Sequence, residues 1–188
     1  MPAASPNRSG SRRSTRASSP GPPAIAVIVS RYNASITDRL LAGARDAYAE
    51  CGGDPASLRV IPAPGSFELP ALAQAAARWG RYQGVLALGC LIKGDTKHDE
   101  YIAHAVAQGL VNVTISTGVP CAFGVLTVNT PEQAQDRAGG AEGNKGAEAM
   151  LALVDTIREI DALRGSGRGA GPPGFGRKIR DKAKGGVR

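Results

Sequence analysis

The chain has 188 residues, enough for one domain with a complete hydrophobic core, because single domains most often contain roughly 100–150 residues. Its apolar fraction of 42% is that of a globular protein, but aromatic residues make up only 4%, so the core must consist mainly of Ala, Val, Leu and Ile. No run of about 18 apolar residues occurs, and a membrane-spanning helix is therefore not expected.

The formal charge of +7 originates at the two ends of the chain. Residues 1–23 carry four arginines and no acid, and residues 164–188 carry eight basic groups against one aspartate. Residues 24–163 contain 11 basic and 15 acidic residues, a net charge of −4. A nucleic-acid surface is therefore not expected on the folded part, and only the two ends could contact RNA or an acidic cargo.

Both ends are predicted to be disordered tails, because they combine Ser, Gly, Pro and charge with almost nothing to bury. Residues 1–23 are rich in Arg and Ser and lack acids, as transit peptides do, so a plastid location is the alternative to the cytoplasm. The cysteines, Cys51, Cys90 and Cys121, are widely spaced and form no C-x-x-C motif. This pattern favours a reducing cytoplasm and indicates neither a disulfide framework nor a metal site.

From residue 24 onwards, short apolar runs alternate with helical patterns. The run AIAVIVS, residues 24–30, has the continuous apolar character of a parallel strand buried on both faces. The following residues repeat apolar side chains at helical spacing, with Ser35 and Asp38 predicted as a capping box and Gly52–Gly53 as the stop.

The same cycle follows twice more. Residues 58–62 are predicted to form a second strand, and the turn PGSFELP leads from it into a helix that ends at Gly80. Residues 84–92 are the longest apolar run and predict the third strand, and a helix is predicted over residues 99–113.

A fourth strand is predicted at residues 121–128. Thr130 then provides a helix cap, Pro131 a first-turn proline and Gln133 a capping-box partner. The Gly-rich link GGAEGNKG connects this helix to a last one that ends near Leu163. Four alternations of strand and helix predict an α/β fold, a three-layer αβα sandwich with a four-stranded parallel sheet.

In such sheets, ligands bind beyond the carboxyl ends of the strands. The segments at those ends are SRYN, PAPGSFE, KGDTKH and VNTPEQ. The chain contains no G-x-G-x-x-G, no P-loop motif and no G-x-S-x-G, so dinucleotide, P-loop and hydrolase functions have little support.

The third strand ends in a polar turn within GCLIKGDTKHDEY. Thr96 and Asp99 could cap the next helix, which would place Lys97 and His98 beside free backbone N–H groups. Such a helix start needs no ligand. It could equally attract a phosphate, with Gly94 letting the ligand approach the backbone, and it would favour a neutral imidazole able to accept and return protons.

The other strand ends also allow two interpretations. Glu68 could complement a helix dipole and Phe67 could belong to the core, or the pair could bind a flat heterocycle or a polyol. Tyr32 could pack against other side chains of the protein, or it could stack on the ring of such a ligand. Arg137 could cap its own helix or bind a phosphate, and Lys145 is a further cation of interest.

Taken together, RYN, PGSFELP, GCLIKGDTKHDEY and FGVLTVNTPEQAQDRAGGAEGNKG resemble the lumazine synthase family over residues 24–163. The resemblance implies a flavodoxin-like sheet and a transferase that makes 6,7-dimethyl-8-ribityllumazine, the penultimate step of riboflavin biosynthesis. Its substrates would be 5-amino-6-(D-ribitylamino)uracil and 3,4-dihydroxy-2-butanone 4-phosphate, condensed with loss of phosphate and water. No metal and no organic cofactor would be required.

The resemblance also implies a set of site residues. His98 would transfer protons, and the pyrimidine substrate would be bound, mostly through backbone groups, by Tyr32, Ser66, Phe67, Glu68, Cys90, Leu91, Ile92 and Phe123. The butanone phosphate would be bound by Asp95, Thr96 and Arg137. Lys145 would be an additional site residue, and the neighbouring subunit would supply Phe123, Arg137 and Lys145.

Two positions depart from the commonest family pattern. Tyr32 stands where Phe or Trp is usual, which adds a hydroxyl to the stacking ring, and Lys93 stands where Arg is usual, which removes a planar donor. Members of the family are pentamers, and in some of them twelve pentamers form an icosahedral shell. The short link GGAEGNKG resembles shell-forming members, and riboflavin synthase is a candidate partner.

Two other functions compete with this interpretation. A non-catalytic flavodoxin-like module could hold a flavin or lumazine without turnover, although His98 and Arg137 argue against it. A nucleic-acid-binding protein is disfavoured by the acidic residues 24–163.

Overall fold

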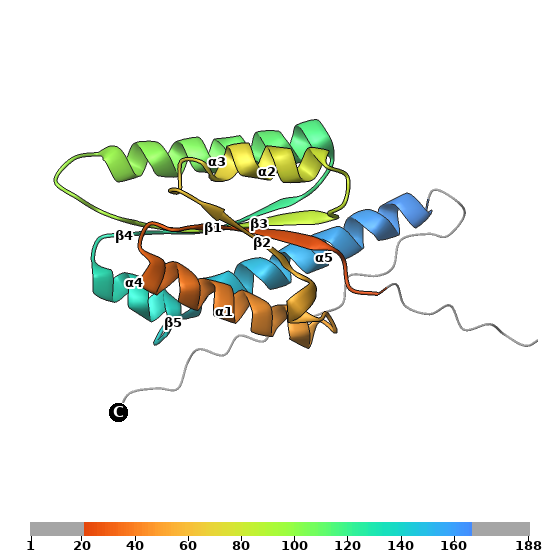
Figure 1. The fold of residues 1–188 in the computed structure, drawn as a ribbon, viewed down its shortest axis with the longest axis horizontal. Helices are drawn as coiled ribbons and strands as arrows, with labels where there is room; N and C mark the ends of the chain where they lie inside the picture. Colours follow the sequence, from red (N-terminus) through yellow and green to blue (C-terminus); the bar gives the residue numbers. More distant parts are fainter. Residues whose placement is uncertain (1–20, 167–188) are drawn as a thin grey trace, which may run out of the picture.

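The computed structural model describes residues 21–166, which form the predicted three-layer sandwich (Figure 1). The central sheet is parallel, has the strand order β2-β1-β3-β4, and consists of β1 (Ile25–Ser30), β2 (Arg59–Ala63), β3 (Gly84–Ile92) and β4 (Cys121–Val128). It is flanked by the helices α1 (Ala34–Glu50), α2 (Leu69–Arg78), α3 (His98–Thr117), α4 (Pro131–Arg137) and α5 (Lys145–Ser166). A short 3-10 helix, η1 (Pro55–Ser57), precedes β2. The α/β prediction is confirmed.

Helices α2 and α3 cover one face of the sheet, and α1, α4 and α5 cover the other (Figure 1). Successive residues of a strand point to opposite faces, so each strand supplies two cores. Ile25, Val27 and Val29 of β1 belong to the core under α1 and α5, whereas Ala26 and Ile28 belong to the core under α2 and α3. This double burial explains why β1 and β3 are continuous apolar runs.

Two predicted helix caps were wrong. Helix α1 begins at Ala34, after Asn33 in a left-handed conformation, so Ser35 lies inside the helix and does not cap it. Helix α3 begins at His98 after Lys97, and no side chain caps it, so Thr96 is not its N-cap. Lys97 has φ −80° and ψ 21°, whereas a capping residue normally has extended backbone.

The predicted start of α4 is confirmed. Thr130 accepts a hydrogen bond from the Gln133 N–H at 3.3 Å, and Gln133 Oε1 accepts one from the Asn129 N–H at 2.9 Å. The Gly-rich link, for which no secondary structure was predicted, forms a small antiparallel hairpin of β5 (Ala138–Gly140) and β6 (Gly143–Asn144). Helix α5 then extends to Ser166, beyond the predicted end near Leu163.

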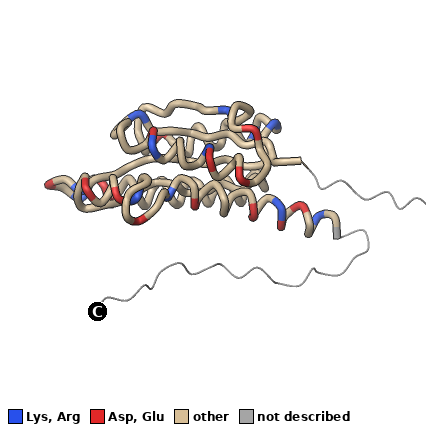
Figure 2. Tube along the Cα trace, turned by 90° about the horizontal axis from the view of Figure 1, so that it is seen from below, with Lys and Arg blue, Asp and Glu red and all other residues tan. Residues whose placement is uncertain are grey.

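The charges of this part of the chain are mixed. Figure 2 shows Lys and Arg interspersed with Asp and Glu along residues 21–166, in keeping with the net acidity of residues 24–163. No helix in the described range is long and apolar enough to cross a membrane. The predicted disorder of the basic tails concerns residues that lie almost entirely outside this range.

Candidate active site

A cavity of about 580 Å³ opens at the carboxyl ends of β1 and β3, between the loop after β2 and the start of α3. Its size is typical of a site for a small organic ligand. The residues that line it are Tyr32, Asn33, Gly65, Ser66, Phe67, Glu68, Cys90, Leu91, Ile92, Gly94, Thr96, His98, Asp99 and Ile102. Segments from three strand ends therefore meet here, as the rule for open parallel sheets predicts.

Two aromatic rings stand at this cavity with most of their surface uncovered. Tyr32 is 71% exposed and Phe67 is 62% exposed, although large apolar side chains are usually buried. Tyr32 lies two residues after the end of β1, and Phe67 lies four residues after the end of β2. Exposed ring faces beside a cavity are suited to stacking on a flat heterocycle.

The hydroxyl of Ser66 is a buried polar group without a protein partner. Ser66 is only 5% exposed, and its Oγ has no hydrogen-bond partner among residues 21–166. Gly89 provides the space for it, because a Cβ at that position would lie 2.7 Å from the Ser66 oxygen. Since buried hydroxyl groups are normally hydrogen-bonded, a ligand or water in the cavity is the natural partner.

Cys90 lies at the floor of the site and is fully buried. Burial raises the pKa of its thiol to about 11. A thiol that holds its proton this strongly is a poor nucleophile at neutral pH. Cys90 therefore contributes backbone groups and packing to the cavity.

This pKa predicts a pH dependence of stability. The folded state keeps the Cys90 proton to higher pH than the unfolded chain, so this contribution is complete below pH 9.0 and is lost as the pH rises to about 11. Over this range, we expect the free energy of unfolding to fall by about 2 kcal/mol more in the wild type than in Cys90→Ala. Urea unfolding at a series of pH values measures the difference, and identical pH dependence in both proteins would contradict the prediction.

The start of α3 forms the second side of the cavity. The first backbone hydrogen bond of this helix runs from the Tyr101 N–H to the Lys97 carbonyl, so the N–H groups of His98, Asp99 and Glu100 have no intrahelical acceptor. With no side-chain cap, this positive helix end can bind an anion. The His98 side chain is exposed at the same end, where it can reach a ligand.

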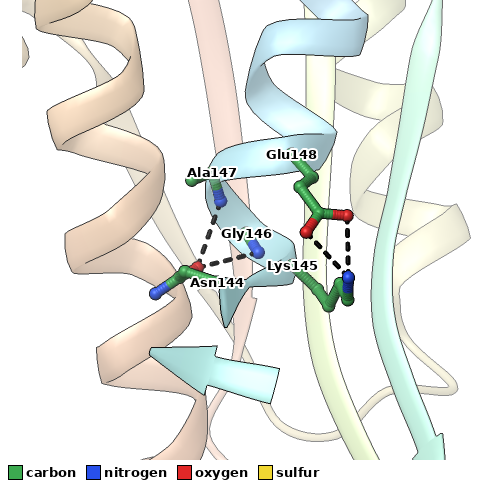
Figure 3. A network of polar contacts seen from close by, with 5 residues as sticks. All are labelled: Asn144, Lys145, Gly146, Ala147 and Glu148. Carbon is green, nitrogen blue, oxygen red and sulfur yellow. Dashed lines mark hydrogen bonds and ion pairs between the residues drawn. The ribbon is translucent and has the colours of Figure 1, made fainter. Parts of the chain in front are cut away.

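Four predicted site residues do not line this cavity. Asp95 lies between two lining residues but is exposed, and Phe123 is on β4 with 43% of its surface exposed. Arg137 ends α4 and donates a hydrogen bond from Nη1 to the Gln133 carbonyl at 3.3 Å. Lys145 forms an ion pair with Glu148 at 2.7 Å (Figure 3). That a neighbouring subunit supplies the last three remains a prediction.

Within residues 21–166, no three His, Cys, Asp or Glu side chains lie close enough together to hold a metal ion. The polar groups of the cavity are backbone amides, three hydroxyls, two carboxylates and one imidazole, together with the Asn33 amide. These groups can orient a ligand and move protons.

Sequence reasoning missed Asn33, which lines the cavity and donates from Nδ2 to the Cys90 carbonyl at 3.0 Å. The strand-end rule could have identified Asn33, because this residue belongs to the strand-end segment SRYN. It also missed Asp99 and Ile102 as lining residues, both in the first turns of α3.

The sequence also resembles known proteins over most of its length. The sequence profile of 6,7-dimethyl-8-ribityllumazine synthase matches residues 23–161. The chain belongs to this family.

Several curated lumazine synthases are similar to the chain over most of their length. A protein of Thermus thermophilus is 48% identical over 139 residues, which cover 74% of this chain and 88% of the relative. That of Deinococcus radiodurans is 47% identical over 139 residues, covering 74% and 90%. The 6,7-dimethyl-8-ribityllumazine synthase 1 of Caulobacter vibrioides is 46% identical over 145 residues, covering 77% and 95%.

Proposed function

We propose that the chain is a transferase that condenses 5-amino-6-(D-ribitylamino)uracil with 3,4-dihydroxy-2-butanone 4-phosphate to form 6,7-dimethyl-8-ribityllumazine, phosphate and water. The observation that carries this proposal is a cavity that joins exposed aromatic rings to an uncapped helix end bearing His98, in a chain of the lumazine synthase family. The aromatic rings suit a flat pyrimidine, and the helix end suits a phosphate.

The pyrimidine substrate is proposed to bind at the β1 and β2 side of the cavity. Its ring stacks on Tyr32, and its ring and ribityl groups bond to the loop residues Ser66, Phe67 and Glu68 and to the backbone of Cys90, Leu91 and Ile92. The unpartnered Ser66 hydroxyl supports this assignment, because it offers a ready hydrogen-bonding group.

The butanone phosphate is proposed to bind at the start of α3, near Asp95 and Thr96. The free N–H groups of the first turn and the helix dipole favour a phosphate there, although Asp99 and Glu100 add negative charge. A guanidinium such as that of Arg137, brought by a neighbouring subunit, would offset this charge.

Holding the two substrates together supplies much of the catalysis. The 5-amino group of the pyrimidine attacks the ketone carbonyl, and imine formation releases water. Orientation of the two reactants alone can contribute about 7–11 kcal/mol. Proton transfers accompany imine formation, phosphate elimination and ring closure, and His98 is proposed to accept and return these protons.

The decisive assay mixes the purified chain with both substrates and follows lumazine fluorescence and phosphate release together. Turnover with equal amounts of lumazine and phosphate supports the proposal. A rate no higher than that of the two substrates alone would refute it. If the chain then still bound lumazine, it would be a non-catalytic binding module.

Arg137 provides a test of the phosphate assignment. We expect Arg137→Ala to raise KM for the butanone phosphate about tenfold while KM for the pyrimidine changes little, because one charge-assisted bond is lost. Arg137→Lys should recover only part of the loss, since an ammonium lacks the planar fork. Steady-state kinetics with each substrate varied in turn measure both constants.

Arg45→Ala is the matched control, because Arg45 is an exposed arginine on α1 away from the strand ends. It should leave both KM values unchanged. If Arg137→Ala behaved like this control, Arg137 would only cap its own helix.

The assembly is proposed to be a homopentamer, with twelve pentamers forming an icosahedral shell. Exposed apolar side chains support an interface: on α3, Tyr101 is 71%, Val111 52% and Ile115 78% exposed, and Phe123 on β4 is 43% exposed. Native mass spectrometry tests both the pentamer and the icosahedral shell. Free single chains would refute the pentamer, and free pentamers would refute the shell.

The cytoplasm is the proposed location, and the free thiols of Cys51, Cys90 and Cys121 fit a reducing compartment. Riboflavin synthase, which would consume the lumazine, is the proposed partner. Co-purification of the two proteins tests this association.

A further inference from the structure

Asn33 is the one residue other than glycine with a positive φ in the described range 21–166, at φ 59° and ψ 45°. A left-handed backbone is sterically unfavourable for an L-residue, although Asn tolerates it better than most. Such strain persists only where the surrounding structure fixes it, and it clusters at functional sites. Asn33 lies in the cavity wall, between Tyr32 and the first residue of α1.

The side chain of Asn33 joins two strand ends. Its Nδ2 donates to the Cys90 carbonyl at 3.0 Å. The pairing of β1 with β3 ends at Val29 and Leu88, so this carbonyl lies two residues beyond the last pair. The amide therefore takes the place of a strand N–H and satisfies the carbonyl of a fully buried residue.

We propose that Asn33 is a positioning residue for the pyrimidine substrate, an inference that rests on the proposed function. Its left-handed turn sets the Tyr32 ring at the cavity, where 71% of that residue is exposed. Its amide holds the Cys90 peptide, the first of the backbone groups assigned to the same substrate. One side chain thus sets the distance between the stacking ring and the strand that faces it.

Three substitutions at Asn33 separate the contribution of its left-handed backbone from that of its side-chain amide. Asn33→Gly keeps the left-handed backbone and removes the amide. Asn33→Asp keeps the shape of the side chain but turns a carboxylate oxygen toward the Cys90 carbonyl. Asn33→Ala makes the left-handed backbone conformation less favourable and also removes the amide. In the full chain, we expect Asn33→Gly and Asn33→Asp to raise KM for the pyrimidine about tenfold, with kcat and KM for the butanone phosphate within about threefold of wild type.

Asn33→Ala should raise KM for the pyrimidine further than Asn33→Gly, because alanine resists the left-handed backbone. A general loss of folding would instead lower kcat or the active fraction without selecting one substrate. Unchanged KM for the pyrimidine in Asn33→Gly and Asn33→Asp would overturn the inference.

Hydrogen exchange of the substrate-free chain, measured by mass spectrometry, gives a readout independent of turnover. Peptides covering residues 30–33 and 89–93 should exchange faster in Asn33→Gly than in the wild type, whereas peptides of α5 should not change. Wild-type protection in both peptides would overturn the inference whatever the kinetics. A wild-type chain that made no lumazine would refute the proposed function, and the exchange result would still decide whether Asn33 holds the two strand ends together.

Discussion

Replacing His98 by alanine is expected to lower kcat roughly 10- to 100-fold while KM for each substrate stays within about threefold. The expected loss lies at or below the lower limit of the contribution of about 10²–10⁴-fold that is typical of general acid–base catalysis, because His98 is exposed and water can take over part of the proton transfer. Steady-state lumazine formation gives the rate constants. Added imidazole should restore part of the turnover of His98→Ala, because the site is open to solvent.

His104→Ala is the matched control. His104 is also exposed on α3, but its ring nitrogen contacts the Glu100 carbonyl of its own helix at 2.7 Å and it does not line the cavity. Its removal should leave kcat unchanged. Equal rates in His98→Ala and the wild type, or equal losses in both variants, would remove His98 from the mechanism.

The largest expected effect on stability is that of Gly146→Ala. Gly146 lies in the first turn of α5, directly against the backbone of α1: an added Cβ would overlap the Leu40 carbonyl oxygen and lie 2.7 Å from its carbonyl carbon. Backbone atoms cannot rotate away as a side chain can, so the two helices must separate. We expect the free energy of unfolding to fall by about 2–4 kcal/mol, measured by urea unfolding.

Gly165→Ala tests whether this loss comes from the contact. Gly165 lies near the other end of α5, and an added Cβ there would meet nothing within 4 Å. Alanine favours helix, so Gly165→Ala should be neutral or slightly stabilising. If Gly146→Ala were as stable as Gly165→Ala, the close approach of α1 and α5 would not limit the stability of the chain.

Neighbouring polar contacts explain why the helices approach so closely. Asn144 accepts hydrogen bonds from the N–H groups of Gly146 and Ala147 at 2.9 and 3.1 Å, which caps α5 (Figure 3). The same side chain donates to the Arg39 carbonyl of α1 at 2.8 Å. One asparagine therefore starts α5 and ties it to α1.

The sheet and its ligand-binding edge were predictable from the sequence. Strand β3 coincides with the apolar run at residues 84–92, because a strand buried on both faces must be apolar throughout. The cavity formed where the strand-end rule placed it, and it contains the predicted Tyr32, Ser66 and His98.

The helix starts were less predictable, because contacts distant in sequence decide them. The predicted cap at Ser35 was wrong since Asn33 turns the chain earlier, and that turn is fixed by a bond to Cys90. Likewise, GGAEGNKG was predicted as a link and forms a hairpin, whose last residue, Asn144, is held against α1.

The sequence by itself determined the fold class and the order of the strands and helices along the chain, because burial on two faces imposes an apolar pattern that a single sequence displays. The family followed from the resemblance of four motifs to lumazine synthases. Only the tertiary structure decided that the amide of Asn33 joins the ends of β1 and β3, that the Ser66 hydroxyl is buried without a protein partner, and that Gly146 meets the backbone of α1. These features depend on distances between residues that are far apart in the chain, and packing sets such distances.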